Sequence, residues 1–331
     1  LIGFLFGFGF YLSGIFWIAY SLTFDESFKF LIPYALFFVP FFLSIFTGIT
    51  TLIVGQFISY NFSSILLFSG SLALSDYIRG KILTGFPWNL WSYSWSWFTE
   101  ILQTLNFLGL FAFNLLAITF FSLPAVLFFR ISLRKKFFIN SVAVLLVYSI
   151  YIYGTYSINK NKDFLNYIDK NEKVYTKIIS PNFDLKYNTS IEEVEDKLKK
   201  LIRYSNPQQE TKTLFVWPEG VFTGFSFSEI SKYSYLIKNK FNKNHFILFC
   251  INTLDKNSGE NFNSMIVVNN DFELIRQYNK IKLVPFGEFL PFEFFLNKIG
   301  LRKITQGHGS FSAGKEYKNI ILDNINILPL I

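Results

Sequence analysis

The chain has 331 residues, of which 51% are hydrophobic and 16% are charged, and its formal net charge is +8. One Cys and two His cannot form a disulfide within the chain or a typical zinc site, so we expect neither metal catalysis nor a cofactor. Part of the modest positive charge lies on loops beside apolar segments, and aromatic residues are not interleaved with the basic ones. This favours attraction to anionic lipid head groups over nucleic-acid binding.

Charged residues are distributed unevenly along the chain. Only 11 of them lie before residue 155, and all the others follow. We therefore predict a membrane domain over residues 1–154, a polar linker over 155–172 and an α/β domain over 173–331.

The first domain contains five apolar stretches that are long enough to cross a bilayer, which takes roughly 20 residues of helix. They cover residues 2–21, 30–54, 58–77, 102–129 and 137–154. Backbone groups find no water in hydrocarbon, so each stretch is predicted to be a helix. A signal peptide would explain none of this, because the stretches are too many and too long.

The orientation follows from "RISLRKK" (130–136), which places four cations between the last two predicted spans. The positive-inside rule assigns this loop to the cytoplasm. The second domain then faces the periplasm of a bacterium with two membranes, as do the loops 23–29 and 76–95. Arg79 and Lys81 in the latter loop count mildly against this topology.

The second domain alternates between two kinds of pattern. Strands are predicted over 173–180, 213–217, 245–253, 263–270 and 274–286, and amphipathic helices over 190–205 and 226–242. Ser190 and Glu193 have the spacing of a capping box. The alternation indicates α/β layering with some antiparallel neighbours.

The stretch "TLFVWPEG" (213–220) places Glu219 directly after a buried strand that Pro218 ends. Functional groups gather at the carboxyl ends of strands in α/β sheets. With Trp217 and Val221 beside it, the carboxylate would be partly desolvated and suited to act as a general base. The pattern alone leaves open a solvated loop glutamate.

The stretch "YNKIKLVPFGEFLPF" (278–292) is a second candidate. Alternation places Tyr278, Lys280 and Lys282 on one face, and Glu288 follows in an apolar loop. A lysine near a carboxylate could stabilise an oxyanion. It could equally be a charge that protects an edge strand from aggregation.

These two stretches together resemble the nitrilase superfamily, and specifically the bacterial apolipoprotein N-acyltransferase family. Residues 7–22 ("GFGFYLSGIFWIAYSL") and 75–94 ("SDYIRGKILTGFPWNLWSYS") are similar to motifs in the membrane part of that family. The resemblance implies a multi-span α-helical membrane domain. An α/β nitrilase-like domain follows it, an α-β-β-α sandwich that is incomplete at its C-terminal end.

The resemblance also implies roles for individual residues. Glu219 matches the general base, Lys280 the oxyanion-stabilising lysine and Glu288 a further essential acid. Trp88 matches an aromatic at the lipid-facing mouth of the site, and Tyr187 stands in a substrate-contact position where Trp is usual. Asp76 likewise stands where Glu is commoner.

The family's nucleophilic cysteine follows a short buried strand, and here "INILPLI" (325–331) is the matching strand. We therefore expect the nucleophile directly after Ile331, and expect this chain to be an inactive fragment truncated at both ends. Cys250 precedes the lysine motif, which is the wrong chain order, and is predicted to be a small buried hydrophobe. His245 and His308 are expected to be structural or solvated.

The expected function is acyl transfer from a phospholipid to the N-terminal α-amine of a diacylglyceryl-cysteine apolipoprotein through a cysteine thioester. The partners would be these two substrates and the bilayer of the bacterial inner membrane, with the protein a monomer. Two alternatives remain open from the residues: a membrane-anchored nitrilase-type amidase, and a non-catalytic binding or transport protein of the membrane.

Overall fold

The structure is a computed structural model of the chain. It describes residues 1–24, 26–82, 85–167, 175–183, 189–285, 287–292, 294, 298, 310–322 and 325–331. The chain divides into two compact units, Leu1–Asp169 and Lys170–Ile331.

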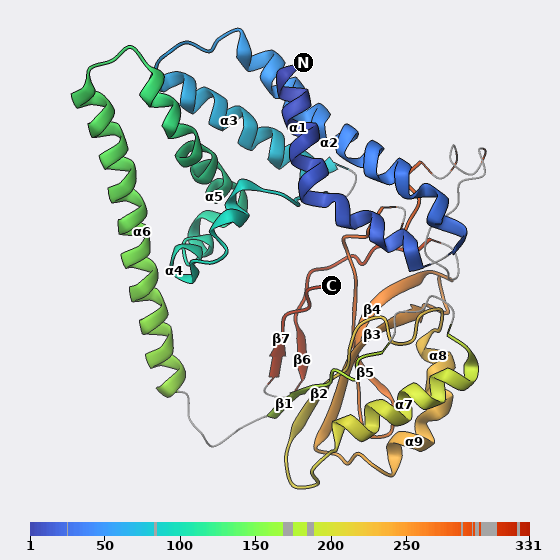
Figure 1. The fold of residues 1–331 in the computed structure, drawn as a ribbon. Helices are drawn as coiled ribbons and strands as arrows, with labels where there is room; N and C mark the ends of the chain where they lie inside the picture. The colour runs from blue at the N-terminus through green and yellow to red at the C-terminus, as the bar shows by residue number, and fades with distance from the viewer. Residues whose placement is uncertain are drawn as a thin grey trace. The chain divides into compact units, whose positions relative to one another are not determined.

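The first unit is helical (Figure 1). Its helices are α1 (Ile2–Ile15), α2 (Ile32–Gly55), α3 (Phe62–Arg79), α4 (Thr99–Leu102), α5 (Leu105–Ser122) and α6 (Leu133–Tyr167). The 3-10 segments η1 (Phe16–Phe24), η2 (Glu26–Leu31), η4 (Trp91–Trp95) and η5 (Leu123–Phe128) connect or extend them. Helix α6 runs through residues 155–167, where we expected a linker.

Four helical segments in the described part of the chain are long and apolar enough to cross a membrane. They are Ile2–Phe24, Phe28–Gly55, Leu105–Phe128 and Leu133–Lys162, and they confirm four of the five predicted spans. The span predicted over 58–77 is not confirmed. It forms α3, whose five serines, together with Asp76 and Arg79, lower its apolar character. The unit is thus a multi-pass membrane domain.

Helices α1 and α2 approach closely because small residues line their contact. A Cβ atom at Gly3 would come within 1.8 Å of Thr51 Oγ1, and one at Gly7 within 1.9 Å of Thr47 Oγ1. Glycines spaced by four on one helix face allow this approach in membrane helices. The two threonine hydroxyls donate to carbonyls of their own helix, so the contact leaves neither of them unsatisfied.

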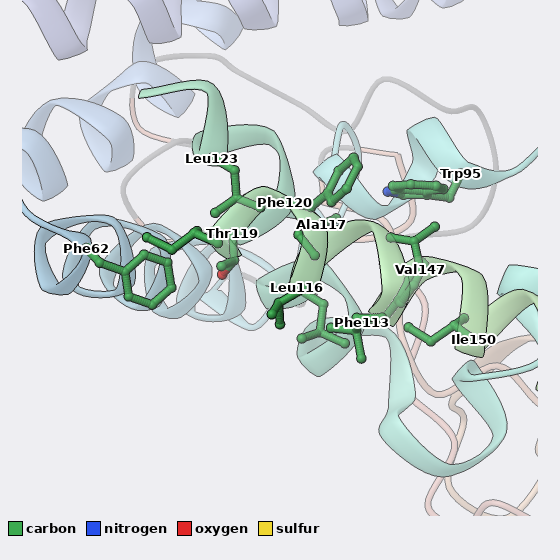
Figure 2. A pocket seen from close by; sticks show the side chains of 14 residues that line it. Phe62, Trp95, Phe113, Leu116, Ala117, Thr119, Phe120, Leu123, Val147 and Ile150 are labelled. Atoms are coloured by element: carbon green, nitrogen blue, oxygen red, sulfur yellow. The ribbon is translucent and has the colours of Figure 1, made fainter. Parts of the chain in front are cut away.

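An apolar cavity of about 180 Å³ lies beside α5 and α6 (Figure 2). Its walls include Phe113, Phe120, Val147 and Ile150, with Trp95 at one end. None of the 14 lining residues is titratable, so this cavity offers no acid or base.

The second unit contains a five-stranded sheet in the order β1-β2-β3-β4-β5. The strands are β1 (Tyr175–Ile178), β2 (Thr213–Val216), β3 (His245–Leu254), β4 (Asn261–Val268) and β5 (Leu274–Asn279). Strands β1, β2 and β3 are parallel, whereas β3, β4 and β5 are antiparallel. The prediction that some neighbouring strands are antiparallel is confirmed. Strands β6 (Ile320–Leu322) and β7 (Ile325–Ile327) form a separate antiparallel pair.

Both faces of the sheet are covered (Figure 1). Helices α7 (Ile191–Ser205), α8 (Phe227–Ile230) and α9 (Ser234–Lys238) bury the larger core against one face. Strands β6 and β7 pack over the other through Ile320 and Leu322. The predicted capping box of Ser190 and Glu193 begins α7. The expected order, membrane helices followed by a layered α/β region, is confirmed.

Candidate active site

Glu219 lies on a tight turn after β2, where the sequence placed it. The strand continues for one residue beyond Val216, because the Trp217 amide donates to the Leu248 carbonyl (2.9 Å). Pro218 then ends the ladder, and Gly220 turns the chain with a φ of 72°. The carboxylate of Glu219 is exposed, so the desolvation predicted from its apolar neighbours is not seen.

The turn itself is firmly anchored to the core. Trp217 is 2% exposed, and its indole donates to the Ser205 hydroxyl of α7 (3.0 Å). Lys197, also on α7, donates to the Val221 carbonyl (2.9 Å). An exposed carboxylate is thus carried by a backbone that packing holds in place.

Lys280 directly follows β5, which is an edge strand of the sheet. The pairing of Ser264 with Asn279 places Asn263 opposite Lys280, so both side chains project from the same face. Two backbone hydrogen bonds hold Lys280, from its amide to the Asn263 carbonyl (2.9 Å) and from the Gly314 amide to its carbonyl (2.8 Å). Its side chain is 13% exposed.

Glu288 binds the Lys280 ammonium. Its Oε1 accepts from Lys280 Nζ (3.0 Å) and from Asn263 Nδ2 (2.7 Å), and its Oε2 accepts from the Val284 amide (2.8 Å). Glu288 is 9% exposed. All three partners are donors, so the carboxylate is satisfied as an acceptor and fixes the position of the ammonium.

A cavity of about 170 Å³ joins Glu219 to Glu288, the partner of Lys280. Glu219, Cys250, Asn252, Asn263 and Glu288 are among its lining residues. It therefore presents a carboxylate that is free to take a proton beside an ion pair that can stabilise a negative oxygen. This combination suits acyl transfer, in which a proton leaves a nucleophile and charge develops on a carbonyl oxygen.

Cys250 lies in this cavity on β3. Burial raises the pKa of its thiol to about 12; the Glu219 carboxylate adds to the rise and the Lys280 ammonium opposes it. The thiol is therefore protonated at neutral pH and a poor nucleophile. Within the described ranges, no three His, Cys, Asp or Glu side chains could hold a metal ion.

Asn263, Phe311 and Gly314 contribute to the site but were not singled out in the sequence. Asn263 holds Glu288, and the amides of Phe311 and Gly314 donate to the Glu288 and Lys280 carbonyls (2.9 and 2.8 Å). The alternation of β4 could have placed Asn263 on the same face as Met265. Its register with β5 could not be read from either strand alone.

Trp88, the predicted lipid contact, belongs to the first unit. Its side chain is 51% exposed, and its ring centroid lies 5.0 Å from that of Trp17. Tyr187 and His308 lie outside the described residues. His245 is 1% exposed; its Nδ1 accepts from the Asn242 amide and its Nε2 contacts the Gln208 carbonyl (both 3.0 Å), which is a structural role.

The chain is similar to known proteins over nearly its whole length. Residues 1–123 match the family model described as the apolipoprotein N-acyltransferase N-terminal domain. The chain is 27% identical to the apolipoprotein N-acyltransferase of Rhodopseudomonas palustris over 99% of its own length and 63% of the relative. The Bradyrhizobium diazoefficiens enzyme of the same name is 30% identical over 95% of this chain and 60% of the relative.

The resemblance to the apolipoprotein N-acyltransferase family is confirmed. A third relative of that name, from Rickettsia prowazekii, is 27% identical over 94% of this chain. The chain spans about three fifths of the length of these relatives. A solved structure of an N-terminal amidase is 17% identical to this chain, with a TM-score of 0.24. The match covers 33% of this chain and 28% of the amidase.

Proposed function

We propose that the whole protein transfers an acyl chain from a phospholipid to the N-terminal α-amine of a diacylglyceryl-cysteine apolipoprotein. The observation that carries the proposal is the match of both units, almost end to end, to relatives named apolipoprotein N-acyltransferase. The cavity that brings Glu219 and Glu288 together, with Lys280 bound to the latter, supplies the chemistry.

In the first step, Glu219 takes the proton from the nucleophilic cysteine thiol of the whole protein. The thiolate attacks the ester carbonyl carbon of the phospholipid, and Lys280 stabilises the oxyanion. The C–S bond forms, the ester C–O bond breaks, and the lysophospholipid oxygen takes up the proton from Glu219. Ile331 packs against the same apolar cluster as Leu248 and Met265, on the sheet face that carries Lys280.

In the second step, the apolipoprotein amine attacks the thioester. The C–N bond forms, the C–S bond breaks, and the proton released by the amine returns the cysteine to its thiol. Because the first product leaves before the second substrate reacts, the kinetics should be ping-pong.

We propose the following division of roles between the parts of the chain. Residues 1–154 hold the protein in the bacterial inner membrane, and residues 173–331 carry the chemistry on the periplasmic side. This placement suits two substrates that are both anchored in the bilayer. The protein would act as a monomer, with Trp88 and Tyr187 contacting lipid substrate.

The test uses the whole protein in phospholipid vesicles with a diacylglyceryl-cysteine peptide. Mass spectrometry should show the peptide heavier by one acyl group, together with lysophospholipid, and without peptide it should show an enzyme-bound thioester that hydroxylamine cleaves. Release of free fatty acid or ammonia without peptide acylation would instead indicate a hydrolase or amidase. Failure to trap a thioester on any cysteine of the whole protein would refute the proposed covalent step.

A further inference from the structure

A buried ion pair lies at the end of α3 in the membrane unit. Asp76 and Arg79 are 3% and 2% exposed, and Asp76 Oδ1 accepts from Arg79 Nη2 at 3.0 Å. Ionised side chains in or beside membrane helices are costly, and they mark functional positions more often than structural ones. The remaining hydrogen bonds of the pair connect α3 to the following loop and to α5.

The guanidinium of Arg79 holds the backbone around Trp88. Its Nη1 donates to the carbonyls of Phe86 (2.6 Å) and Trp88 (2.8 Å), and it lies over the Tyr11 ring at 5.2 Å. Residues 85–90 form no helix or strand, and Pro87 between the two carbonyls has no amide to donate. Arg79 therefore supplies two of the side-chain hydrogen bonds that hold this segment, and the Tyr93 hydroxyl supplies another, to the Pro87 carbonyl (2.9 Å).

The carboxylate of Asp76 extends the same network to α5. Its Oδ2 accepts from Asn114 Nδ2 (2.9 Å), and Asn114 Oδ1 accepts from the Ser92 amide (3.1 Å). Asn114 is fully buried, and Ser92 is 2% exposed. The chain is thus fixed both at Trp88 and four residues after it.

The side chain of Trp88 contrasts with this fixed backbone. The indole is 51% exposed and lies at 60° to the ring of Trp17, itself 43% exposed. Two exposed indoles in a membrane unit offer an apolar surface for a lipid chain. A surface of this kind binds well only if its backbone is held in place beforehand.

We infer that Arg79 is a positioning residue for lipid binding. Through the carbonyls of Phe86 and Trp88, it holds the Trp88 indole where the apolar part of the phospholipid donor is bound, and Asp76 and Asn114 hold Arg79. This inference rests on the proposed function, because it takes the ligand to be the acyl donor.

The kinetic test compares Arg79→Lys with Lys81→Gln in the whole protein. The lysine keeps the charge beside Asp76, but its single ammonium cannot span both carbonyls and the carboxylate. We expect the KM for phospholipid to rise by roughly tenfold, with kcat at saturating lipid nearly unchanged. Lys81, exposed and two residues away, is the control and should leave both constants unchanged. In protein that already carries Trp88→Ala, Arg79→Lys should raise the KM for phospholipid only slightly further.

A second measurement does not depend on acyl transfer. In protein labelled with 5-fluorotryptophan, the ¹⁹F signal of Trp88 is assigned by its loss in Trp88→Phe. Arg79→Lys and the charge-neutral double variant Asp76→Asn/Arg79→Gln should shift and broaden this signal, while the Trp217 signal stays unchanged. An unchanged Trp88 signal would overturn the inference even if the protein transferred no acyl chain. The inference would also be overturned if Trp88→Ala raised the KM for phospholipid but Arg79→Lys altered only the ¹⁹F signal of Trp88 and left that KM unchanged.

Discussion

Glu288 holds the ammonium of Lys280 at 3.0 Å, and both side chains are almost withdrawn from solvent, at 12% and 13% exposure. A charge-assisted hydrogen bond of this kind takes up one N–H of the ammonium and fixes its position next to Glu288, which lines the cavity. We therefore expect Glu288 to act as the group that holds the Lys280 ammonium in place.

Lys280→Ala should lower the rate of acyl transfer by about 100-fold to 1,000-fold, the usual loss when one oxyanion donor is removed. Lys282→Ala is the matched control, because Lys282 lies two residues away and is exposed. Thioester formation by the whole protein, followed by mass spectrometry in single turnover, measures both. Equal losses in the two variants would argue against a specific role for Lys280.

Glu288→Gln should reduce both activity and stability, because it removes the negative charge but keeps the size of the side chain. Leaving one partner of a buried ion pair uncompensated costs about 3–5 kcal/mol, and the partial exposure here places the expected loss at or below the lower end. Chemical denaturation of the second unit, followed by Trp217 fluorescence, gives the free energy of unfolding. The same substitution at exposed Glu210 should leave that free energy nearly unchanged.

Gly314→Ala should displace the segment whose backbone is hydrogen-bonded to Lys280. A Cβ atom at Gly314 would lie 2.2 Å from the Asn279 carbonyl oxygen, which is backbone and cannot turn aside. The hydrogen bond from the Gly314 amide to the Lys280 carbonyl would lengthen, and activity should fall. Ala313→Ser, at the exposed neighbouring position, should retain activity, and amide hydrogen exchange at residue 314 would report the change directly.

Cys250 should react slowly with iodoacetamide in the folded protein. With a thiol pKa near 12 against an ordinary 9.0, only about one thiol in 10,000 is ionised at pH 8. The sign of the pH effect follows from the same shift. A raised folded-state pKa contributes stability that is fully present below pH 9 and is lost as the pH rises towards 12. Cys250→Ala should reduce the decrease in folding stability between pH 9 and pH 12. The whole protein with this substitution should still form the thioester.

Some of the site could be read from the sequence and some could not, for a physical reason. Glu219 was predicted from local order, since a strand, a proline and a glycine place it at a strand end. The contacts of Lys280 with Asn263 and Gly314 depend on strand register and on a segment more than thirty residues away. A pattern of alternation gives the face of a strand but not its partner.

The membrane unit shows the same limit. Length and apolar character predicted four spans well, but α3 was predicted as a fifth because its serines were outnumbered by Leu, Ile and Phe. The buried polar residues of α3 bind the backbone of residues 86 and 88 in the following loop, and Asn114, which is 38 residues from Asp76 in the sequence.

The mixed direction of the sheet also implies an order of assembly. Strands β3, β4 and β5 are consecutive and antiparallel, joined by short turns, whereas β2 joins β3 in parallel only after the chain has passed through α8 and α9. Pairings that close short loops form sooner than those that close long ones. Lys280 and Asn263 should therefore meet early during folding, and Glu219 should be the last of these groups to reach its place.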